Sequence, residues 1–249
     1  MNDNRENVSF NGEIFQQKSK NVRGVPRSQN VSEREKSDLY KTYQNALSRI
    51  TLPEPQFSNE ISFWDTIKNR HTTRAFSNKP ISMMELSLLL FGISGLTRKF
   101  PKFAFRTVPS AGALFPIETY IAINNVSELK QGIYHYDIEN HSLDYLKEGD
   151  FQKTLTDACY GQRMVSKSAV SFIWTAVIER TRATYKERAY RYIYIDCGHI
   201  GQNFYLVAEA LGLNACVVGA YYDDDINDFL DLDENEEFAI YMGVVGKSR

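Results

Sequence analysis

The sequence has few of the residues that mark secreted or metal-binding proteins. Its 249 residues include only three cysteines, Cys159, Cys197 and Cys216, and no C-x-x-C pair. An odd number of widely separated cysteines is typical of buried, reduced thiols rather than of a disulfide framework. The four histidines are scattered without the spacing of a metal site, so we expect no bound metal.

The chain also lacks long apolar runs and an excess of either charge. No segment is long enough to span a bilayer, and the polar N-terminus does not resemble a signal peptide, so we expect a cytoplasmic protein. Lys and Arg number 29 against 31 Asp and Glu, which leaves a formal charge of -2. This balance provides no electrostatic surface for nucleic acid or for a membrane.

Three common nucleotide-binding and hydrolase motifs are absent as well. No G-x-G-x-x-G follows a predicted strand, so a Rossmann dinucleotide site is not indicated. The Gly-Lys-Ser of residues 246–248 is not a P-loop, because Tyr241 occupies the position of the first required glycine. No G-x-S-x-G nucleophile elbow is present.

Composition and local pattern predict one main domain behind a polar leader. With 43% hydrophobic residues, the chain can bury one substantial core. We assign residues 61–249 to the main domain and residues 1–60 to a leader with a short helix that begins at a capping box over residues 32–35. The apolar residues expected on one face of that helix are Leu39, Tyr43, Ala46 and Leu47.

Hydrophobic periodicity in the main domain predicts alternating helices and strands. Short helices are expected over 63–68 and from Ser82, where Glu85 completes a capping box. A long helix through Phe204 is expected to end at Gly212. The expected strands cover 117–123, 132–136, 142–146, 169–176, 214–220 and 237–244. This order predicts an α+β domain in which helices flank a central mixed sheet.

Three segments could contact a phosphorylated ligand. Residues 70–74, Arg-His-Thr-Thr-Arg, include two guanidinium groups that can donate to phosphate oxygens in a fixed fork. Residues 109–116 are rich in small side chains that allow a backbone to approach a ligand closely, and residues 243–249 contain two cations. Each segment is also compatible with solvated surface or an ordinary turn. The residues alone therefore indicate only compatibility with a phosphorylated planar cofactor.

Taken in order, these segments resemble the nitroreductase superfamily over residues 61–249. Within it, the chain is most similar to the SagB-type dehydrogenases, on the basis of residues 106–116, 132–136, 187–192 and 196–203. The resemblance implies a nitroreductase-like fold and a homodimer with FMN at the subunit interface. It also implies oxidation of thiazoline and oxazoline rings in a ribosomally made peptide.

The resemblance also implies roles for individual residues. Those expected to hold the phosphate and ribityl tail of FMN are Arg70, His71, Thr72, Lys247 and Arg249. Arg74 is expected at the N1/O2 edge of the flavin, where a cation stabilises the negative charge of the reduced ring. Val218 and Gly219 are expected beside the reactive N5 atom. The loop expected to close the site from the partner subunit consists of Pro109, Ser110, Ala111, Gly112 and Ala113.

Tyr185 and Lys186 are the candidate catalytic residues, as groups that could remove a proton while hydride leaves the substrate. Many azoline oxidases of this group carry a Lys-Tyr pair here, whereas this chain has Thr184-Tyr185-Lys186. A structural tyrosine and a solvated lysine are the alternatives. The chain also ends without the extension that many nitroreductases exchange, so we expect dimerisation to rest on the other helices, including the one over 190–212.

Two further functions remain open from the sequence. The first is an NAD(P)H-dependent FMN reductase acting on a nitro compound, a quinone or a dehydroamino acid in a peptide. The second is a non-catalytic flavin-binding partner in a peptide-modifying complex. In each case we expect a peptide or small-molecule substrate, and other peptide-modifying enzymes are candidate partners.

Overall fold

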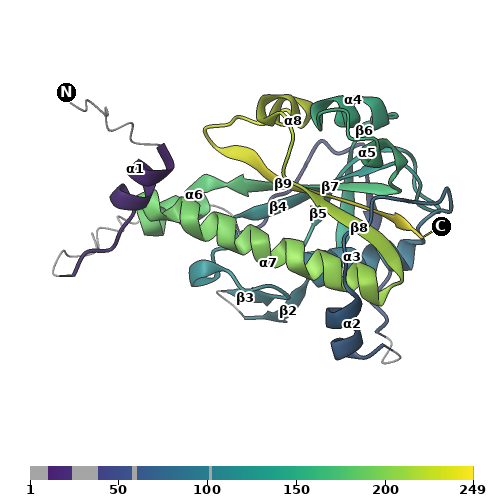
Figure 1. Ribbon diagram of the computed structural model, residues 1–249, viewed down its shortest axis with the longest axis horizontal. Helices are drawn as coiled ribbons and strands as arrows, with labels where there is room; N and C mark the ends of the chain where they lie inside the picture. Colours follow the sequence, from purple (N-terminus) through teal and green to yellow (C-terminus); the bar gives the residue numbers. More distant parts are fainter. Residues whose placement is uncertain (1–10, 24–38, 58–60, 101–102, 249) are drawn as a thin grey trace, which may run out of the picture.

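A seven-stranded sheet forms the centre of the molecule (Figure 1). The computed structural model describes residues 11–23, 39–57, 61–100 and 103–248. The strands of the sheet are β1 (Ser48–Thr51), β4 (Ile117–Ile123), β5 (Gly132–Asp137), β6 (Ser142–Glu148), β7 (Val170–Val177), β8 (Leu213–Val218) and β9 (Glu237–Lys247). They lie in the order β1-β6-β5-β4-β7-β9-β8, so β1 and β8 are the outer strands.

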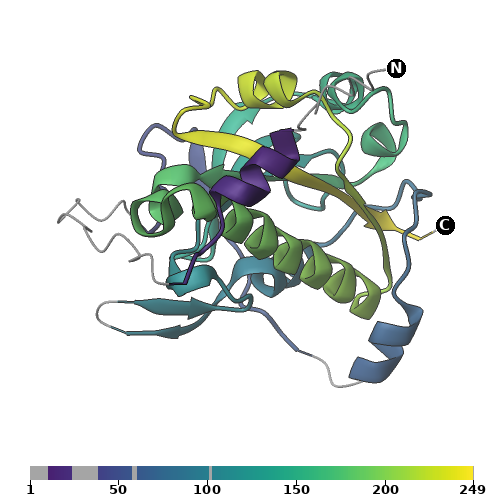
Figure 2. The same cartoon turned by 60° about the vertical axis from the view of Figure 1, so that its left-hand side comes forward.

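Helices cover both faces of this sheet. The helices in the described ranges are α1 (Asn11–Lys18), α2 (Phe63–Asn69), α3 (Met83–Ser94), α4 (Gln152–Ala158), α5 (Met164–Lys167), α6 (Ile178–Tyr185), α7 (Ala189–Ala210) and α8 (Asp223–Phe229). The long α7 and α3 lie on one face, and α4, α5 and α8 lie on the other (Figures 1 and 2). A separate hairpin consists of β2 (Leu96–Lys99) and β3 (Ala104–Arg106). None of the helices in the described ranges combines the length and apolarity needed to cross a membrane.

Local sequence signals predicted several of these elements correctly. The capping box of α3 is present: Glu85 N donates to Ser82 Oγ at 3.2 Å, and Ser82 N donates to the Glu85 carboxylate at 2.9 Å. The long helix ends as expected, with Gly212 in the left-handed region at φ 64°. The predicted hairpin is β5 and β6. The three cysteines are free and buried, as expected.

The α+β class and the flanking helices are confirmed, but the central sheet is antiparallel rather than mixed. Every pairing between its strands is antiparallel. Helix α7 connects β7 to β8 by the kind of crossover that usually joins neighbouring parallel strands. Here β9 lies between those two strands and pairs with both. β7 and β8 run in the same direction, but they are not neighbours, so the insertion of β9 between them leaves only antiparallel pairings.

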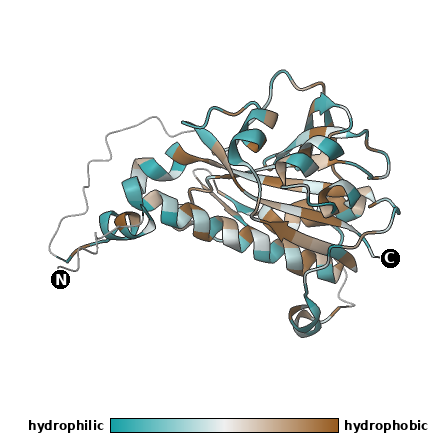
Figure 3. Ribbon diagram, turned by 45° about the horizontal axis from the view of Figure 1, so that its top comes forward, coloured by the Kyte–Doolittle hydropathy of each residue, from teal (hydrophilic) through white to brown (hydrophobic). Residues whose placement is uncertain are grey.

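The hydrophobic core lies on both faces of the sheet. Against α7, the fully buried rings of Phe172 and Trp174 pack on Phe204, with centroid separations of 5.0 and 5.4 Å. A second apolar cluster lies beneath α4, α5 and α8. Figure 3 shows that apolar residues concentrate on the strands and on the helix sides turned toward them. This rigid centre holds β8 and α7, which carry the site described below.

The helix expected around Leu39–Leu47 is not formed. Its predicted capping box at residues 32–35 lies outside the described residues, and residues 39–47 form turns and irregular backbone. Lys41 Nζ donates to the Tyr120 hydroxyl at 2.7 Å, and it also pairs with Glu237. These polar contacts with residues distant in the sequence override the local helical pattern. The helix in the described part of the leader is α1 instead.

Candidate functional site

The predicted cationic segment runs along the outer edge of β8. Thr73 N donates to Ala215 O at 2.9 Å, and the side-chain amide of Asn214 donates to Ala75 O at 2.7 Å. β8 pairs with β9 on its other side. Residues 70–74 therefore lie on the side of β8 that the sheet leaves open.

Tyr205 of α7 joins this segment to β8. Its hydroxyl lies 3.0 Å from Thr72 Oγ1 and accepts a hydrogen bond from Val217 N at 3.0 Å. The Arg70 guanidinium lies over its ring, 5.2 Å from the centroid. The sequence analysis did not single out Tyr205, because a tyrosine on an amphipathic helix usually packs in the core. Only its three contacts show that it contributes to the site.

The backbone of β8 presents hydrogen-bonding groups to the open edge. Along an outer strand, alternate residues direct their N–H and C=O groups away from the neighbouring strand. Ala215 O and Val217 N point outward, since their partners are Thr73 and Tyr205. Gly219 comes directly after the strand, two residues beyond Val217, so it falls in the same alternating set as Ala215 and Val217. It is exposed. The alternation therefore directs the Gly219 amide to the edge occupied by residues 70–74.

The side chains at this edge are predominantly cationic. His71 and Arg74 are exposed, and Arg70 is half-buried. His71 Nδ1 lies 2.7 Å from Asn69 O and 3.9 Å from the Glu209 carboxylate. Burial raises the pKa of the Cys216 thiol, and the adjacent Arg74 guanidinium partly opposes that rise. A cation beside β8 and an exposed imidazole create an environment suited to an anionic group.

Lys247, near the end of β9, is already engaged in an ion pair. Its ammonium donates to Glu85 of α3. Burial disfavours the charged form of Glu85, but Lys247 and the Ser82 cap hold the pKa of Glu85 below its usual value. A phosphate contact by Lys247 would therefore have to share this ammonium. Arg249 lies outside the described residues.

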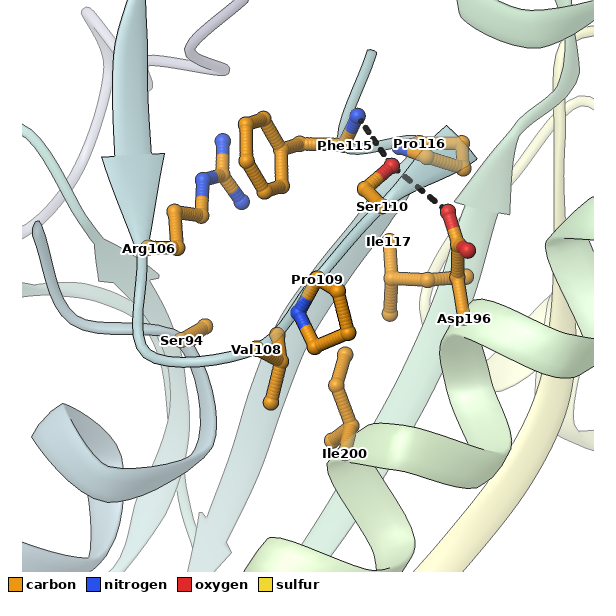
Figure 4. Close-up of a pocket in the computed structure, with 10 residues that line it drawn as sticks. All are labelled: Ser94, Arg106, Val108, Pro109, Ser110, Phe115, Pro116, Ile117, Asp196 and Ile200. Atoms are coloured by element: carbon orange, nitrogen blue, oxygen red, sulfur yellow. Dashed lines mark hydrogen bonds between the residues drawn. The ribbon is translucent and has the colours of Figure 1, made fainter. Parts of the chain in front are cut away.

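The loop over residues 109–113 lies elsewhere, against the first half of α7. The Ser110 hydroxyl donates to the Asp196 carboxylate at 2.6 Å, as Figure 4 shows. Gly112 has φ 65°, and a Cβ atom added there would lie 2.7 Å from the Tyr185 hydroxyl. Along α7, Asp196 and Tyr205 are about 13 Å apart at 1.5 Å per residue. One chain therefore keeps this loop apart from the cationic segment.

The two candidate catalytic residues differ in their surroundings. The Tyr185 ring packs at 4.6 Å from the Tyr192 ring, and its hydroxyl approaches Gly112. Lys186 is exposed, so this chain does not provide the burial that the general-base hypothesis requires. Its φ of 52° is unusual for a residue with a side chain. Tyr185 therefore fits the predicted role better than Lys186.

The sequence of this chain is similar to those of several known proteins. The chain is 35% identical to the nitroreductase-like protein MJ1384 of Methanocaldococcus jannaschii, over 80% of this chain and 96% of that protein. It is 34% identical to the trifolitoxin-processing protein TfxB of Rhizobium leguminosarum bv. trifolii, over 56% of this chain and 39% of that protein. The microcin B17-processing protein McbC of Escherichia coli is 27% identical over 52% of this chain and 49% of its own length.

A solved structure and a family model agree with these relatives. The crystal structure of a nitroreductase-like protein from Anabaena variabilis superposes with a TM-score of 0.77 and 26% identity, covering 95% of this chain and 47% of that one. The chain thus spans half or less of TfxB, McbC and the Anabaena protein, but nearly all of MJ1384. The model of the nitroreductase family matches residues 67–247. The chain belongs to the nitroreductase family.

Proposed function

We propose that this chain is an FMN-dependent dehydrogenase of the SagB type, which oxidises thiazoline or oxazoline rings in a peptide to thiazoles or oxazoles. The observation that carries the proposal is the cationic segment 70–74 at the open edge of β8, with the exposed Gly219 directly after that strand. Membership of the nitroreductase family supports flavin chemistry. The relatives named for trifolitoxin and microcin B17 processing support a peptide substrate.

The donors at this edge fit the two ends of FMN. Arg70, His71 and Thr72 offer a guanidinium, an imidazole and a hydroxyl within three residues, a set that suits a phosphate. Arg74 and the Gly219 amide offer a cation and an N–H group for the ring. A ligand that combines a phosphate with a planar, electron-accepting ring uses both sets. This chemistry favours FMN over a cofactor without a terminal phosphate.

The separation of the loop over 109–113 from residues 70–74 supports a homodimer. Asp196, which contacts this loop, and Tyr205, which contacts Thr72, are about 13 Å apart along α7, so one chain holds the loop and the cationic segment at different places on this helix. The loop can cover the ring bound by a partner if the α7 helices pack together. Tyr194 and Ile195 on α7 are each 53% exposed, and exposed apolar side chains of this kind are typical of interfaces. We therefore place one FMN on each open edge and the covering loop on the partner subunit.

The residues of the chain then have distinct tasks in the reaction. When bound, FMN supplies the acceptor for the hydride that leaves one ring carbon of the azoline. The second hydrogen leaves the adjacent atom as a proton, and Tyr185 is the group we assign to receive it or pass it to solvent. Arg74 would stabilise the negative charge that the two electrons bring to the ring. Dioxygen or another two-electron acceptor is needed to restore the oxidised cofactor.

A visible spectrum of the purified protein with added FMN is the first test. Bound flavin should appear, and under anaerobic conditions it should bleach when an azoline-containing peptide is supplied, with the peptide losing two hydrogens by mass spectrometry. A protein that binds no flavin would overturn the proposal. The corresponding azole peptide is the control, because it has no hydride to give.

A reductase is the second candidate, and the relation to MJ1384 favours it. That protein is named as a nitroreductase and aligns over almost its full length. In this case NADH or NADPH would bleach the flavin promptly, and a nitro compound or quinone would restore its colour. Flavin that stays oxidised with either nicotinamide but bleaches with an azoline peptide would favour the dehydrogenase.

A further inference from the structure

We propose that Asp196 is a positioning residue that holds the loop over residues 109–113 in the shape with which it covers the flavin of the partner subunit. The inference rests on the proposed function, because the flavin and the partner subunit come from it. It assigns to Asp196 a role through the loop, not a contact with the substrate.

Both oxygens of the Asp196 carboxylate are used by the loop. Oδ2 accepts the Ser110 hydroxyl at 2.6 Å, and Oδ1 accepts Ala111 N at 3.3 Å. Ser110 Oγ in turn accepts Phe115 N at 2.9 Å (Figure 4). The carboxylate therefore contacts the start of the loop directly, and through Ser110 it is linked to Phe115, two residues after the loop. The Asp196 residue is only 5% exposed, so it is held in place by the packing of α7.

The loop needs such support because its backbone is unfavourable. Gly112, Ala113 and Phe115 have φ values of 65°, 53° and 45°. Glycine tolerates this region, but residues with a Cβ atom rarely adopt it. Conformations of this kind persist where surrounding contacts specify them. Asp196 accepts hydrogen bonds from the residues just before this stretch, and Ser110 Oγ accepts one from Phe115 N at its end. These bonds act together with Ala113 N donating to Ser110 O and Arg180 donating to Phe115 O.

The space beside Asp196 within this chain is too small for a substrate. The pocket beside it measures about 10 Å³ and includes Pro109, Ile117 and Ile200 in its lining (Figure 4). That volume suits one water molecule, whereas small-molecule sites measure about 300–1,000 Å³. Burial raises the pKa of Asp196, and the hydrogen bonds from Ser110 and Ala111 oppose that rise. Asp196 is thus a buried residue of α7 whose carboxylate connects that helix to the loop by hydrogen bonds.

The first experiment compares Asp196→Asn, Asp196→Ala, Ser110→Ala and the Asp196→Ala/Ser110→Ala double variant. We expect each single variant to weaken FMN binding by about 10-fold, and the double variant to be no worse than the worse single, because the two groups act as one unit. The visible circular dichroism of bound flavin should change in the same variants. Asp228→Asn, on the exposed surface of α8, is the control and should match the parent protein.

Thermal unfolding without FMN separates the inference from a general loss of structure. Ser110→Ala keeps α7 intact, so it remains informative if Asp196→Ala does not fold. Unchanged FMN affinity and dichroism in Asp196→Asn and Ser110→Ala would overturn the role of Asp196 while leaving the proposed function standing. A parent protein that binds no FMN would overturn both.

A mixed dimer tests whether the loop acts on the partner. One subunit carries Asp196→Asn and the other Arg74→Ala, with different affinity tags so that only the mixed species is purified. If each loop covers the partner's flavin, one site combines an intact Arg74 with an intact loop, and the dimer should bind one FMN tightly. The control has both substitutions in one subunit beside an unchanged partner, and neither of its sites is intact. Tight binding by the control and not by the first dimer would show that the loop serves its own chain and would overturn the proposal.

Discussion

The Tyr205 hydroxyl lies 3.0 Å from Thr72 Oγ1, and this contact connects the longest helix to the cationic segment at the edge of the sheet. The same hydroxyl accepts a hydrogen bond from Val217 N, so it joins α7 both to β8 and to residues 70–74. Helix α7 therefore supports two separate segments of the chain. Its later half supports the segment that we assign to FMN, and its earlier half supports the loop over residues 109–113 through Asp196.

Replacement of Tyr205 by Phe tests the first of these supports. Tyr205→Phe keeps the ring beside Arg70 but leaves Val217 N without its acceptor, which should cost about 1–2 kcal/mol of folding stability. We expect FMN affinity to fall by about 5- to 10-fold because Thr72 loses its partner. Fluorescence titration of FMN and thermal unfolding measure the two effects. Tyr160→Phe, at an exposed position between α4 and α5, should change neither.

Arg74 should control both the affinity and the redox properties of the bound flavin. We expect Arg74→Ala to weaken FMN binding by about 10- to 100-fold and to make the reduction potential of the bound flavin more negative. Arg74→Lys should recover part of the potential, because the positive charge remains. Spectroelectrochemistry at saturating FMN checks this prediction. Arg98→Ala on β2 is the matched control; an equal shift in that variant would contradict a local effect of Arg74.

The buried pair of Glu118 and Arg180 should dominate acid stability. Burial would raise the pKa of Glu118, but Arg180 and His135 lower it to about 2. Because the pKa in the folded state is below the unfolded value of about 4.3, the stabilisation is present above pH 4.3 and is lost as the pH falls toward 2. Melting temperatures measured across this range should show that decline.

Glu118→Gln should remove this dependence. The substitution leaves the Arg180 charge buried without its counter-charge, so we expect a loss of about 3 kcal/mol at neutral pH. The difference in melting temperature between the parent and Glu118→Gln should shrink as the pH falls to about 2. Glu128→Gln, at an exposed position, should stay within about 0.5 kcal/mol of the parent. A constant difference at all pH values would contradict the assignment to Glu118.

The exposed apolar side of α7 should form the dimer interface. Ile195 is 53% exposed, and burying such a side chain contributes about 1.5–3 kcal/mol. We expect Ile195→Asp to raise the dimer dissociation constant by at least about 10-fold, as measured by light scattering across a dilution series. Leu47→Asp is the control, because Leu47 is 61% exposed and precedes β1 at the opposite edge of the sheet. A dimer that tolerates Ile195→Asp but not Leu47→Asp would place the interface elsewhere.

The candidate site was only partly predictable. The segment 70–74 and the loop 109–116 were recognisable because clusters of cations and of small residues are visible in the linear sequence. Tyr205 and Asp196 were not singled out for a role, because the composition of a helix does not show which side chains meet a distant loop. Lys186 was predicted as a catalytic base, with a solvated lysine as the alternative; its side chain is exposed in the single chain, and its role stays a prediction.

The sequence by itself determined several local elements of this protein and the family to which it belongs. Residues close together in the chain form the Ser82–Glu85 cap, the end of α7 at Gly212 and the β5–β6 hairpin. The pattern of neighbouring residues is therefore enough to predict these features. Only the tertiary structure decided that β9 lies between β7 and β8 and makes the sheet antiparallel. It also decided that residues 39–47 are not helical. Strand order and side-chain contacts join residues far apart in sequence, and local periodicity contains no information about which distant partner they meet.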